Sequence, residues 1–269
     1  MTIARSERLL NYALLVLFAA AAVFPVVLIV ATALSPDRIG EAGSFRFGNF
    51  AQAWDEGHFG AYMRTSVLVA LVVVTAATAF SIMAGYAFGT MRMRGSGVIF
   101  YLLLLGIMVP TEALVVALYF DLRSLGLTNT LVAIALPQVA QSVAFGTYWM
   151  RAWFRSSSRE VVEAARLDGA GSWRTLWLVL VPMARPAITT MVVLVFLWTW
   201  NEFLIPLVMA TDETLRTAPL GLAFFQGQYT SGTALLAAAA VLVALPVVVV
   251  FVVLQRHVIR GMIEGSVTS

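Results

Sequence analysis

Six polar or aromatic side chains stand inside long apolar runs of this sequence. The set comprises Glu112, Gln138, Gln141, Trp198, Asn201 and Glu202. Glu112 and Glu202 are the carboxylates of these runs, and a carboxylate there normally faces a bundle interior or a wet cavity. The spacing of Trp198, Asn201 and Glu202 allows all three to share one helix face.

Two kinds of chemistry suit these six residues. An aromatic ring beside amides and carboxylates fits a polyol, because the ring covers an apolar face while the acids accept hydrogen bonds from hydroxyls. Alternatively, polar side chains bond across helices and hold membrane helices together or gate them. The residue types alone leave both interpretations open.

A second polar constellation lies in the segment 151–185, between two apolar runs. Ser157 and Glu160 have the spacing of a capping box, which predicts a helix over residues 158–167. Gly169 allows a sharp turn, and a second short helix is expected over residues 173–180. Pro182 and Pro186 should end that helix and begin the next one. The expected tip exposes Glu163, Arg166 and Asp168.

The chain lacks the residues of several common active sites. It has no cysteine, and its two histidines, His58 and His257, lie far apart in the sequence. We therefore expect no catalytic residue and no metal site. All 17 basic residues are arginines, so the lysine that a P-loop uses to reach ATP phosphates is missing.

Composition places the chain in a membrane. Hydrophobic residues make up 61% of it, charged residues 12%, and the mean hydropathy is +0.90. A water-soluble chain of this size cannot cover so much apolar surface. Six runs each reach the roughly 20 residues that a spanning helix needs, which predicts one all-α integral membrane domain over residues 1–269. The expected transmembrane helices cover residues 9–34, 65–90, 98–120, 130–150, 186–210 and 233–254.

The first of these runs is expected to be a retained helix, since it is longer than the apolar core of a signal peptide. Arginines set the orientation, because positive charge near span ends stays cytoplasmic. With the N-terminus inside, twelve arginines are cytoplasmic and five are outside. Both termini and the segment 151–185 are therefore expected inside. The outer five are Arg38, Arg46, Arg64, Arg123 and Arg216.

The first outer segment, residues 35–64, is rich in glycine and is the least helical part by composition. It also carries Phe45, Phe47, Phe50, Trp54 and Phe59. These rings suit an aromatic belt at the headgroup level. A surface that contacts a solute-delivering protein is the alternative.

Several strings resemble one family of transporters. EAARLDGA at 163–170, followed by VLVP at 179–182, resembles the "EAA" loop of ATP-binding-cassette importer permeases. WNEFLIPL at 200–207 and AGYA at 84–87 resemble carbohydrate-type permeases, as do GLTNT at 126–130 and QRHVIRG at 255–261. The resemblance covers about residues 49–267. It is to the binding-protein-dependent (MetI-like, type I importer) family, and within it to the second-permease type of maltose, glycerol-phosphate and trehalose-like systems.

The resemblance implies a mechanism and a set of partners. They are a second permease, two ATP-binding subunits that hold ATP and Mg, and an extracytoplasmic solute-binding protein at a bacterial cell membrane; no cofactor or nucleic acid is implied for this chain. The coupling loop would contact the ATPase through Glu163, Ala164, Ala165, Arg166, Asp168 and Gly169. The six residues within the apolar runs would then line the translocation path or gate, for a sugar or sugar derivative.

Other classes fit less well. A permease of the same superfamily for a polyamine, peptide or anion is the nearest alternative. A secondary transporter should show inverted repeats or paired broken helices, and the sequence displays neither. An intramembrane enzyme would need a nucleophile–base pair or a metal cluster.

Overall fold

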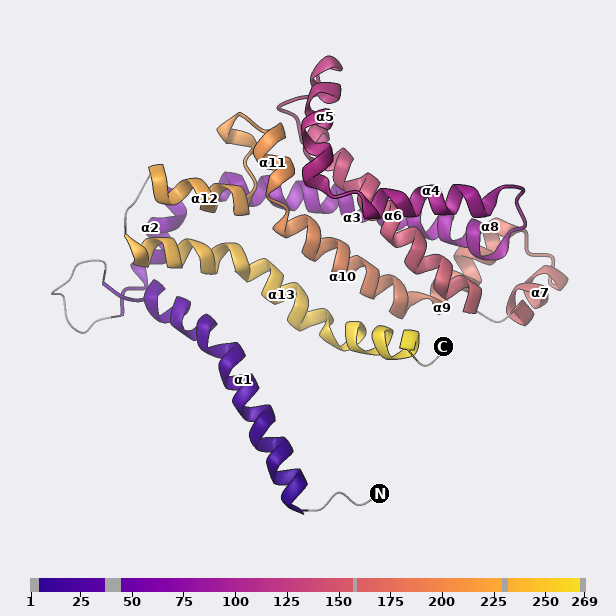
Figure 1. The fold of residues 1–269 in the computed structure, drawn as a ribbon, viewed down its shortest axis with the longest axis horizontal. Helices are drawn as coiled ribbons and strands as arrows, with labels where there is room; N and C mark the ends of the chain where they lie inside the picture. Colours follow the sequence, from indigo (N-terminus) through magenta and orange to yellow (C-terminus); the bar gives the residue numbers. More distant parts are fainter. Residues whose placement is uncertain (1–4, 37–44, 157–158, 229–231, 267–269) are drawn as a thin grey trace. The chain divides into compact units, whose positions relative to one another are not determined.

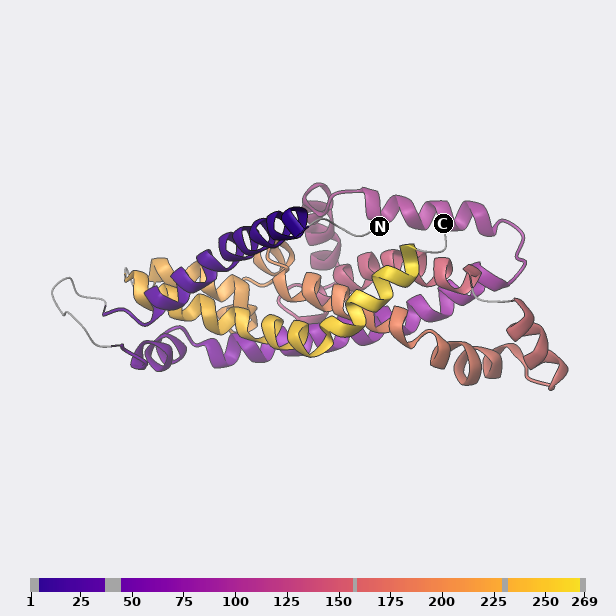
Figure 2. The ribbon, with the colours of Figure 1, turned by 90° about the horizontal axis from the view of Figure 1, so that it is seen from below.

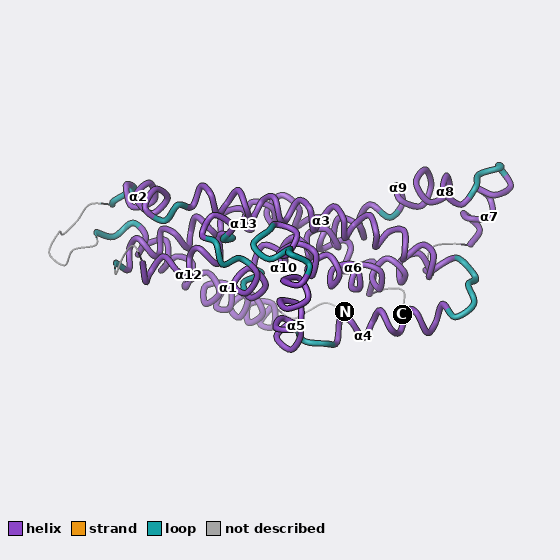
Figure 3. Tube along the Cα trace, turned by 90° about the horizontal axis from the view of Figure 1, so that it is seen from above, coloured by secondary structure: helices purple, strands orange, loops and turns teal. Residues whose placement is uncertain are grey.

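The computed structural model describes residues 5–36, 45–156, 159–228 and 232–266, and all regular structure in these ranges is helical (Figure 3). This confirms the all-α prediction. The chain divides into two compact units. Unit 1 holds Met1–Gly60 and Gly221–Leu245, and unit 2 holds Ala61–Leu220 and Pro246–Ser269.

Unit 1 contains α1 (Arg5–Ala33) and α2 (Gly48–Glu56), with most of α12 (Ala218–Gln228) and the first part of α13 (Thr233–Ser266). The Asn49 amide ties α2 to the end of α1, because its Nδ2 donates to the carbonyls of Ala33 and Ser35 at 2.9 Å each. The low-helicity prediction for residues 35–64 was wrong where the structure describes them. Glycines there stand at helix boundaries, as Gly57 does after α2.

Unit 2 contains the remaining elements. In chain order they are α3 (Phe59–Thr90), α4 (Ser96–Met108), α5 (Thr111–Ser124), α6 (Leu131–Ser156), α7 (Arg159–Leu167), α8 (Ser172–Arg174), the π-helical η1 (Thr175–Leu180), α9 (Val181–Met183), α10 (Arg185–Asn201), α11 (Leu204–Met209) and the 3-10 turn η2 (Glu213–Leu215), followed by the second part of α13.

Helices α3 and α6 approach each other closely because glycine stands at their contact. A Cβ on Gly85 would lie 2.6 Å from the Cβ of Met150 and 3.0 Å from the backbone nitrogen of Arg151. Arg151 also donates from Nε to the carbonyl of Phe88 at 3.3 Å. Its guanidinium lies 3.9 Å from the ring centroid of Phe100 in α4. Helix α4 packs along α6 (Figure 1).

Two of the expected transmembrane helices are interrupted. The helix expected over 98–120 breaks into α4 and α5, which meet at 99°. Pro110 explains the break, since a residue before proline is pushed out of the α region and Val109 has ψ 120°. The helix expected over 186–210 breaks after Asn201. In a continuous helix Pro206 would lack an N–H for the carbonyl of Glu202, and its ring would crowd that carbonyl.

The number of membrane crossings follows from how the breaks are counted. Four helices of the described ranges are long and apolar enough to span a membrane, and six spans result if each of two bent pairs counts as one. These pairs are 96–108 with 111–124, and 172–183 with 185–201, the latter bent by 80°. With several apolar helices, the chain is a multi-pass membrane protein.

Asn129 joins the α5–α6 turn to the end of α11. Its Oδ1 accepts from the backbone nitrogens of Thr211 (2.7 Å) and Asp212 (3.1 Å), and its own backbone N–H donates to the carbonyl of Met209 at 3.0 Å.

Bonds from the Thr214 N–H and hydroxyl lower the pKa of Asp212. Because that pKa is lowered, the contribution of Asp212 to this turn is lost as the pH falls through the lowered value.

We expect Gly85→Ala to destabilise unit 2 by about 1–3 kcal/mol, the usual cost of overpacking a filled contact. The added methyl meets the Cβ of Met150 and backbone atoms of Met150 and Arg151, and none of these can rotate away. Thermal unfolding in detergent measures the change. Gly97→Ala is the matched control, since a Cβ on Gly97 meets nothing within 4 Å. Equal midpoints for both variants would contradict the close-packing argument.

Asn129→Ala should speed amide hydrogen exchange over residues 210–215, with a loss of about 1–2 kcal/mol from the missing bonds and the φ of +58°. Asn129→Gly separates the two causes, because glycine tolerates that φ but makes no side-chain bond. Parent-like exchange in both variants would show that Asn129 does not hold this junction.

Candidate functional site

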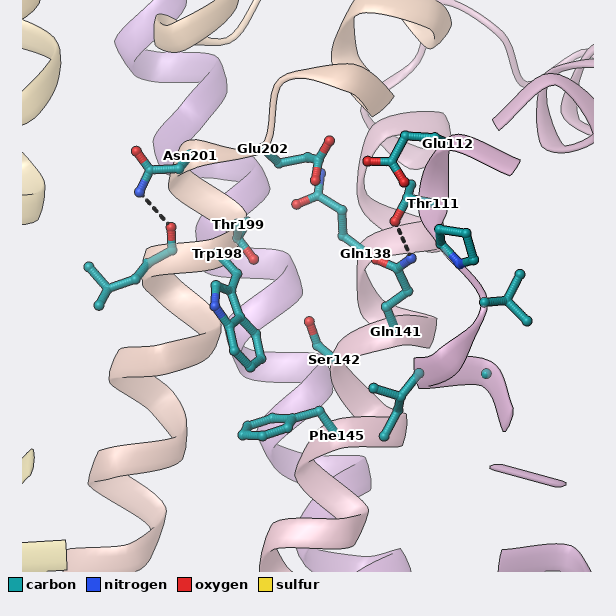
Figure 4. Close-up of a pocket in the computed structure, with 15 residues that line it drawn as sticks. Thr111, Glu112, Gln138, Gln141, Ser142, Phe145, Trp198, Thr199, Asn201 and Glu202 are labelled. Carbon is teal, nitrogen blue, oxygen red and sulfur yellow. Dashed lines mark hydrogen bonds between the residues drawn. The ribbon is translucent and has the colours of Figure 1, made fainter. Parts of the chain in front are cut away.

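A cavity of about 570 Å³ lies in unit 2 between α5, α6 and α10. All six residues predicted within the apolar runs line it (Figure 4). They come from three separate helical regions that the sequence places up to 90 residues apart. The volume falls within the range of about 300–1,000 Å³ that is typical of small-molecule sites.

Helix α6 presents one polar face to this cavity. Gln138, Gln141, Ser142 and Phe145 follow the i, i+3, i+4, i+7 spacing of a single helix face. The Gln141 amide donates from Nε2 to the hydroxyl of Thr111 at 2.6 Å, which ties α6 to the start of α5.

Gln138 is held deep in the wall, with 4% of its surface exposed. Its Nε2 donates to the carbonyl of Ile134 at 2.9 Å. Its Oε1 is buried and has no hydrogen-bond partner in the described part of the chain. A buried amide oxygen without a donor is costly, so this atom is a candidate acceptor for a bound solute or a water.

Helix α10 contributes an aromatic surface. The Trp198 side chain is 51% exposed, and its ring packs edge-on against Phe145 with centroids 4.6 Å apart. Asn201 also lines the cavity but points away from the other polar groups (Figure 4), because its Nδ2 donates to the carbonyl of Leu197 at 2.8 Å.

The two carboxylates extend toward each other at one side of the cavity (Figure 4). Glu112 lies in the first turn of α5 and is exposed. The prediction that Glu202 shares a helix face with Trp198 was wrong, since Glu202 follows the last residue of α10 with ψ 124°. Its Oε1 instead accepts from the backbone nitrogen of Ile205 at 3.0 Å, at the start of α11.

The cavity combines hydrogen-bond acceptors with an aromatic surface. No arginine or histidine is among the described residues that line it. Thr111, Phe145 and Thr199 also line it and were missed in the sequence. For Phe145 the signal was present, four residues after Gln141 on the same helix face. Thr111 could not be found, because its position depends on the bend at Pro110.

The segment from α7 to α9 follows α6 and precedes α10. Helix α7 ends at Leu167 as predicted, and Gly169 has φ +78°. The nitrogen of Ala170 donates to the carbonyl of Ala165, and that of Gly169 to the carbonyl of Arg166, at 2.9 and 3.0 Å. These two bonds form the Schellman motif. Ser157 of the expected capping box lies outside the described residues.

The second expected helix of this segment is longer than predicted. Helical structure runs from Ser172 through η1 to Met183, so Pro182 does not end it. Pro182 stands in the first turn of α9, where the missing N–H costs little. Pro186 opens α10 as predicted. Figure 2 shows this segment extending past the end of α6.

The surface of α7 is divided by chemistry. Glu163, Ala164, Arg166 and Asp168 are exposed, whereas Ala165 is 8% exposed. The two alanines therefore have different environments. Leu167 is 89% exposed, and no sequence pattern singled it out. A charged and partly apolar surface of this kind suits contact with another protein.

Residues 77–264 match the family described as "Binding-protein-dependent transport system inner membrane component". The diacetylchitobiose uptake system permease protein NgcG of Streptomyces coelicolor is 33% identical over 82% of this chain and 74% of its own length. The trehalose transport system permease protein SugB of Mycobacterium tuberculosis is 28% identical over 91% of this chain and 92% of its own.

A solved structure has the same fold. It is the crystal structure of a bacterial ABC transporter involved in the import of the acidic polysaccharide alginate. Its chain matches with a TM-score of 0.79 and 23% identity, covering 95% of this chain and 99% of that one. The matched family segment and these relatives together establish that this chain belongs to the inner-membrane components of binding-protein-dependent transport systems.

Proposed function

We propose that this chain is the permease subunit of an ATP-driven importer for a sugar or sugar derivative, and forms half of its translocation path. The observation that carries the proposal is the cavity of about 570 Å³ in a member of a transport family, where α5, α6 and α10 gather acceptors beside an aromatic ring. Relatives named for diacetylchitobiose and trehalose support a saccharide.

The topology consistent with this role has six crossings and both termini in the cytoplasm of a bacterial cell. Helices α4 and α5 then form one crossing, and α10 with α11 forms another, while residues 172–183 stay outside the membrane. The arginine distribution places the segment 151–185 on the cytoplasmic side. The whole chain acts as one transmembrane domain, and the two interrupted helices border the solute path, where irregular backbone can be tolerated next to a cavity.

The segment from α7 to α9 is the coupling element of this proposal. Glu163 supplies a carboxylate for a basic group on the ATPase, while Ala164 allows close approach. Arg166 and Asp168 flank the same exposed surface, and Leu167 adds an apolar contact. Gly169 holds the turn, and Ala165 fixes α7 to its own chain rather than to the partner.

The chain requires partners for this cycle. Two ATP-binding subunits hold ATP and Mg and hydrolyse the nucleotide, a second permease completes the path, and an extracytoplasmic protein delivers the solute. Glu112 and Glu202 then either contact the solute or bond across the permease pair. A polyamine, peptide or anion as the solute is the alternative within the same family.

We expect Glu163→Lys to abolish uptake in the reconstituted importer while the partner ATPase still binds ATP. The substitution places a cation where an anion is proposed to meet a basic groove. Asp121→Lys, the same charge reversal on an exposed position at the end of α5, should retain uptake. Normal uptake by the Glu163→Lys importer would contradict the coupling role.

Glu202→Gln should lower uptake about tenfold and alter the preference among saccharides, because a charged hydrogen bond contributes about 1.5–3 kcal/mol. Glutamine keeps an oxygen that can accept from Ile205. Uptake rates for a panel of saccharides measure both effects, with Asp121→Asn as the control. Unchanged preference together with weaker co-purification of the second permease would assign Glu202 to interhelical bonding instead.

A further inference from the structure

The polar atoms of the cavity differ in how many hydrogen bonds they can still form with a solute. Each side-chain amide nitrogen that lines it has one of its two N–H donors engaged within the protein: Gln138 donates to Ile134, Gln141 to Thr111 and Asn201 to Leu197. The oxygens are less occupied. The buried Oε1 of Gln138 has no partner in the described chain.

The carboxylates add to this excess of acceptors. Glu202 has one oxygen committed to the nitrogen of Ile205, which leaves its second oxygen for the cavity. Glu112 extends toward it from α5 (Figure 4). An ionised carboxylate only accepts hydrogen bonds, and no basic side chain of the described lining offsets the two.

We infer that this cavity discriminates by charge, admitting neutral or amine-bearing saccharides and rejecting saccharides with carboxylate, phosphate or sulfonate groups. The inference rests on the proposed function, because it assigns a substrate class to the same path. Hydroxyl and ammonium groups are donors and match the free acceptors. Acidic groups bring further acceptors and like charge, which costs free energy in a partly desolvated site.

The fold likeness to an importer of an acidic polysaccharide does not oppose this inference. At 23% identity that likeness concerns the course of the backbone. Charge selectivity depends on the side chains that line the cavity, and these are the residues of this chain.

The absence of cysteine from the sequence allows a direct test. A Val109→Cys variant places a single thiol at the cavity, where the Val109 side chain is 37% exposed. The assembled importer in membrane vesicles open to both sides is treated with three methanethiosulfonate reagents. Their head groups are trimethylammonium, sulfonate and a neutral hydroxyl, and the modified mass of this chain reports each rate.

The measured quantity is the reaction rate of the trimethylammonium reagent divided by that of the sulfonate reagent. This ratio should be at least about tenfold higher at Val109→Cys than at a reference thiol. Leu125→Cys is the reference, since Leu125 is 69% exposed and has the opposite charges of Asp121 and Arg123 nearby in sequence. In the Glu112→Gln, Glu202→Gln background the ratio should fall to that of the reference. The neutral reagent should react at Val109→Cys in all backgrounds.

Three results would overturn the inference. One is a ratio at Val109→Cys equal to the reference with both glutamates present, as expected if a partner cation neutralises them. Another is a ratio that persists after both are replaced, which assigns the selectivity to other groups. The third is no reaction of the neutral reagent, which removes the cavity from any solute path. If the parent importer takes up no saccharide while the charge-dependent rate ratio at Val109→Cys still holds, the proposed function fails and the charge selectivity of the cavity stands.

Discussion

Backbone hydrogen bonding in an apolar environment is the constraint on which this structure depends. Unpaired backbone groups are costly away from water, so long apolar runs form helices. Pro110 and Pro206 each remove a donor, and a helix ends directly before the first and a few residues before the second. At the second break the carboxylate of Glu202 accepts the N–H of Ile205 at 3.0 Å. The same side chain thus satisfies an interrupted backbone and lines the cavity.

The interruptions border a cavity because neighbouring helices are fixed around them. Gly85 allows α6 to approach α3 so closely that a methyl group would collide with Met150. Arg151 joins α3 and α4 at that end of α6, and the bond from Gln141 to Thr111 joins α5 farther along the same helix. Helix α6 is therefore the element that positions both α4 and α5, the two arms of the bent pair.

The cavity and the α7–α9 segment are connected through two helices. Helix α6 lines the cavity and leads into α7, and α10 begins directly after α9 and carries Trp198 to the same cavity. Packed helices move as rigid bodies more readily than they deform. A displacement of the α7–α9 segment by a partner would accordingly be transmitted to the cavity walls along both α6 and α10.

The sequence by itself determined the all-helical class, the multi-pass character and the turn at Gly169, and it singled out six polar or aromatic residues within the apolar runs, because each rests on local composition or spacing. It did not reveal the breaks at Val109 and Glu202, although Pro110 and Pro206 were visible, since a membrane helix can also continue through a proline, as α6 does at Pro137 and α13 at Pro246. Only the tertiary structure decided that these six residues line one cavity and which of their polar atoms already bond within the protein. Those properties depend on contacts between segments distant in the chain, and no local pattern encodes them.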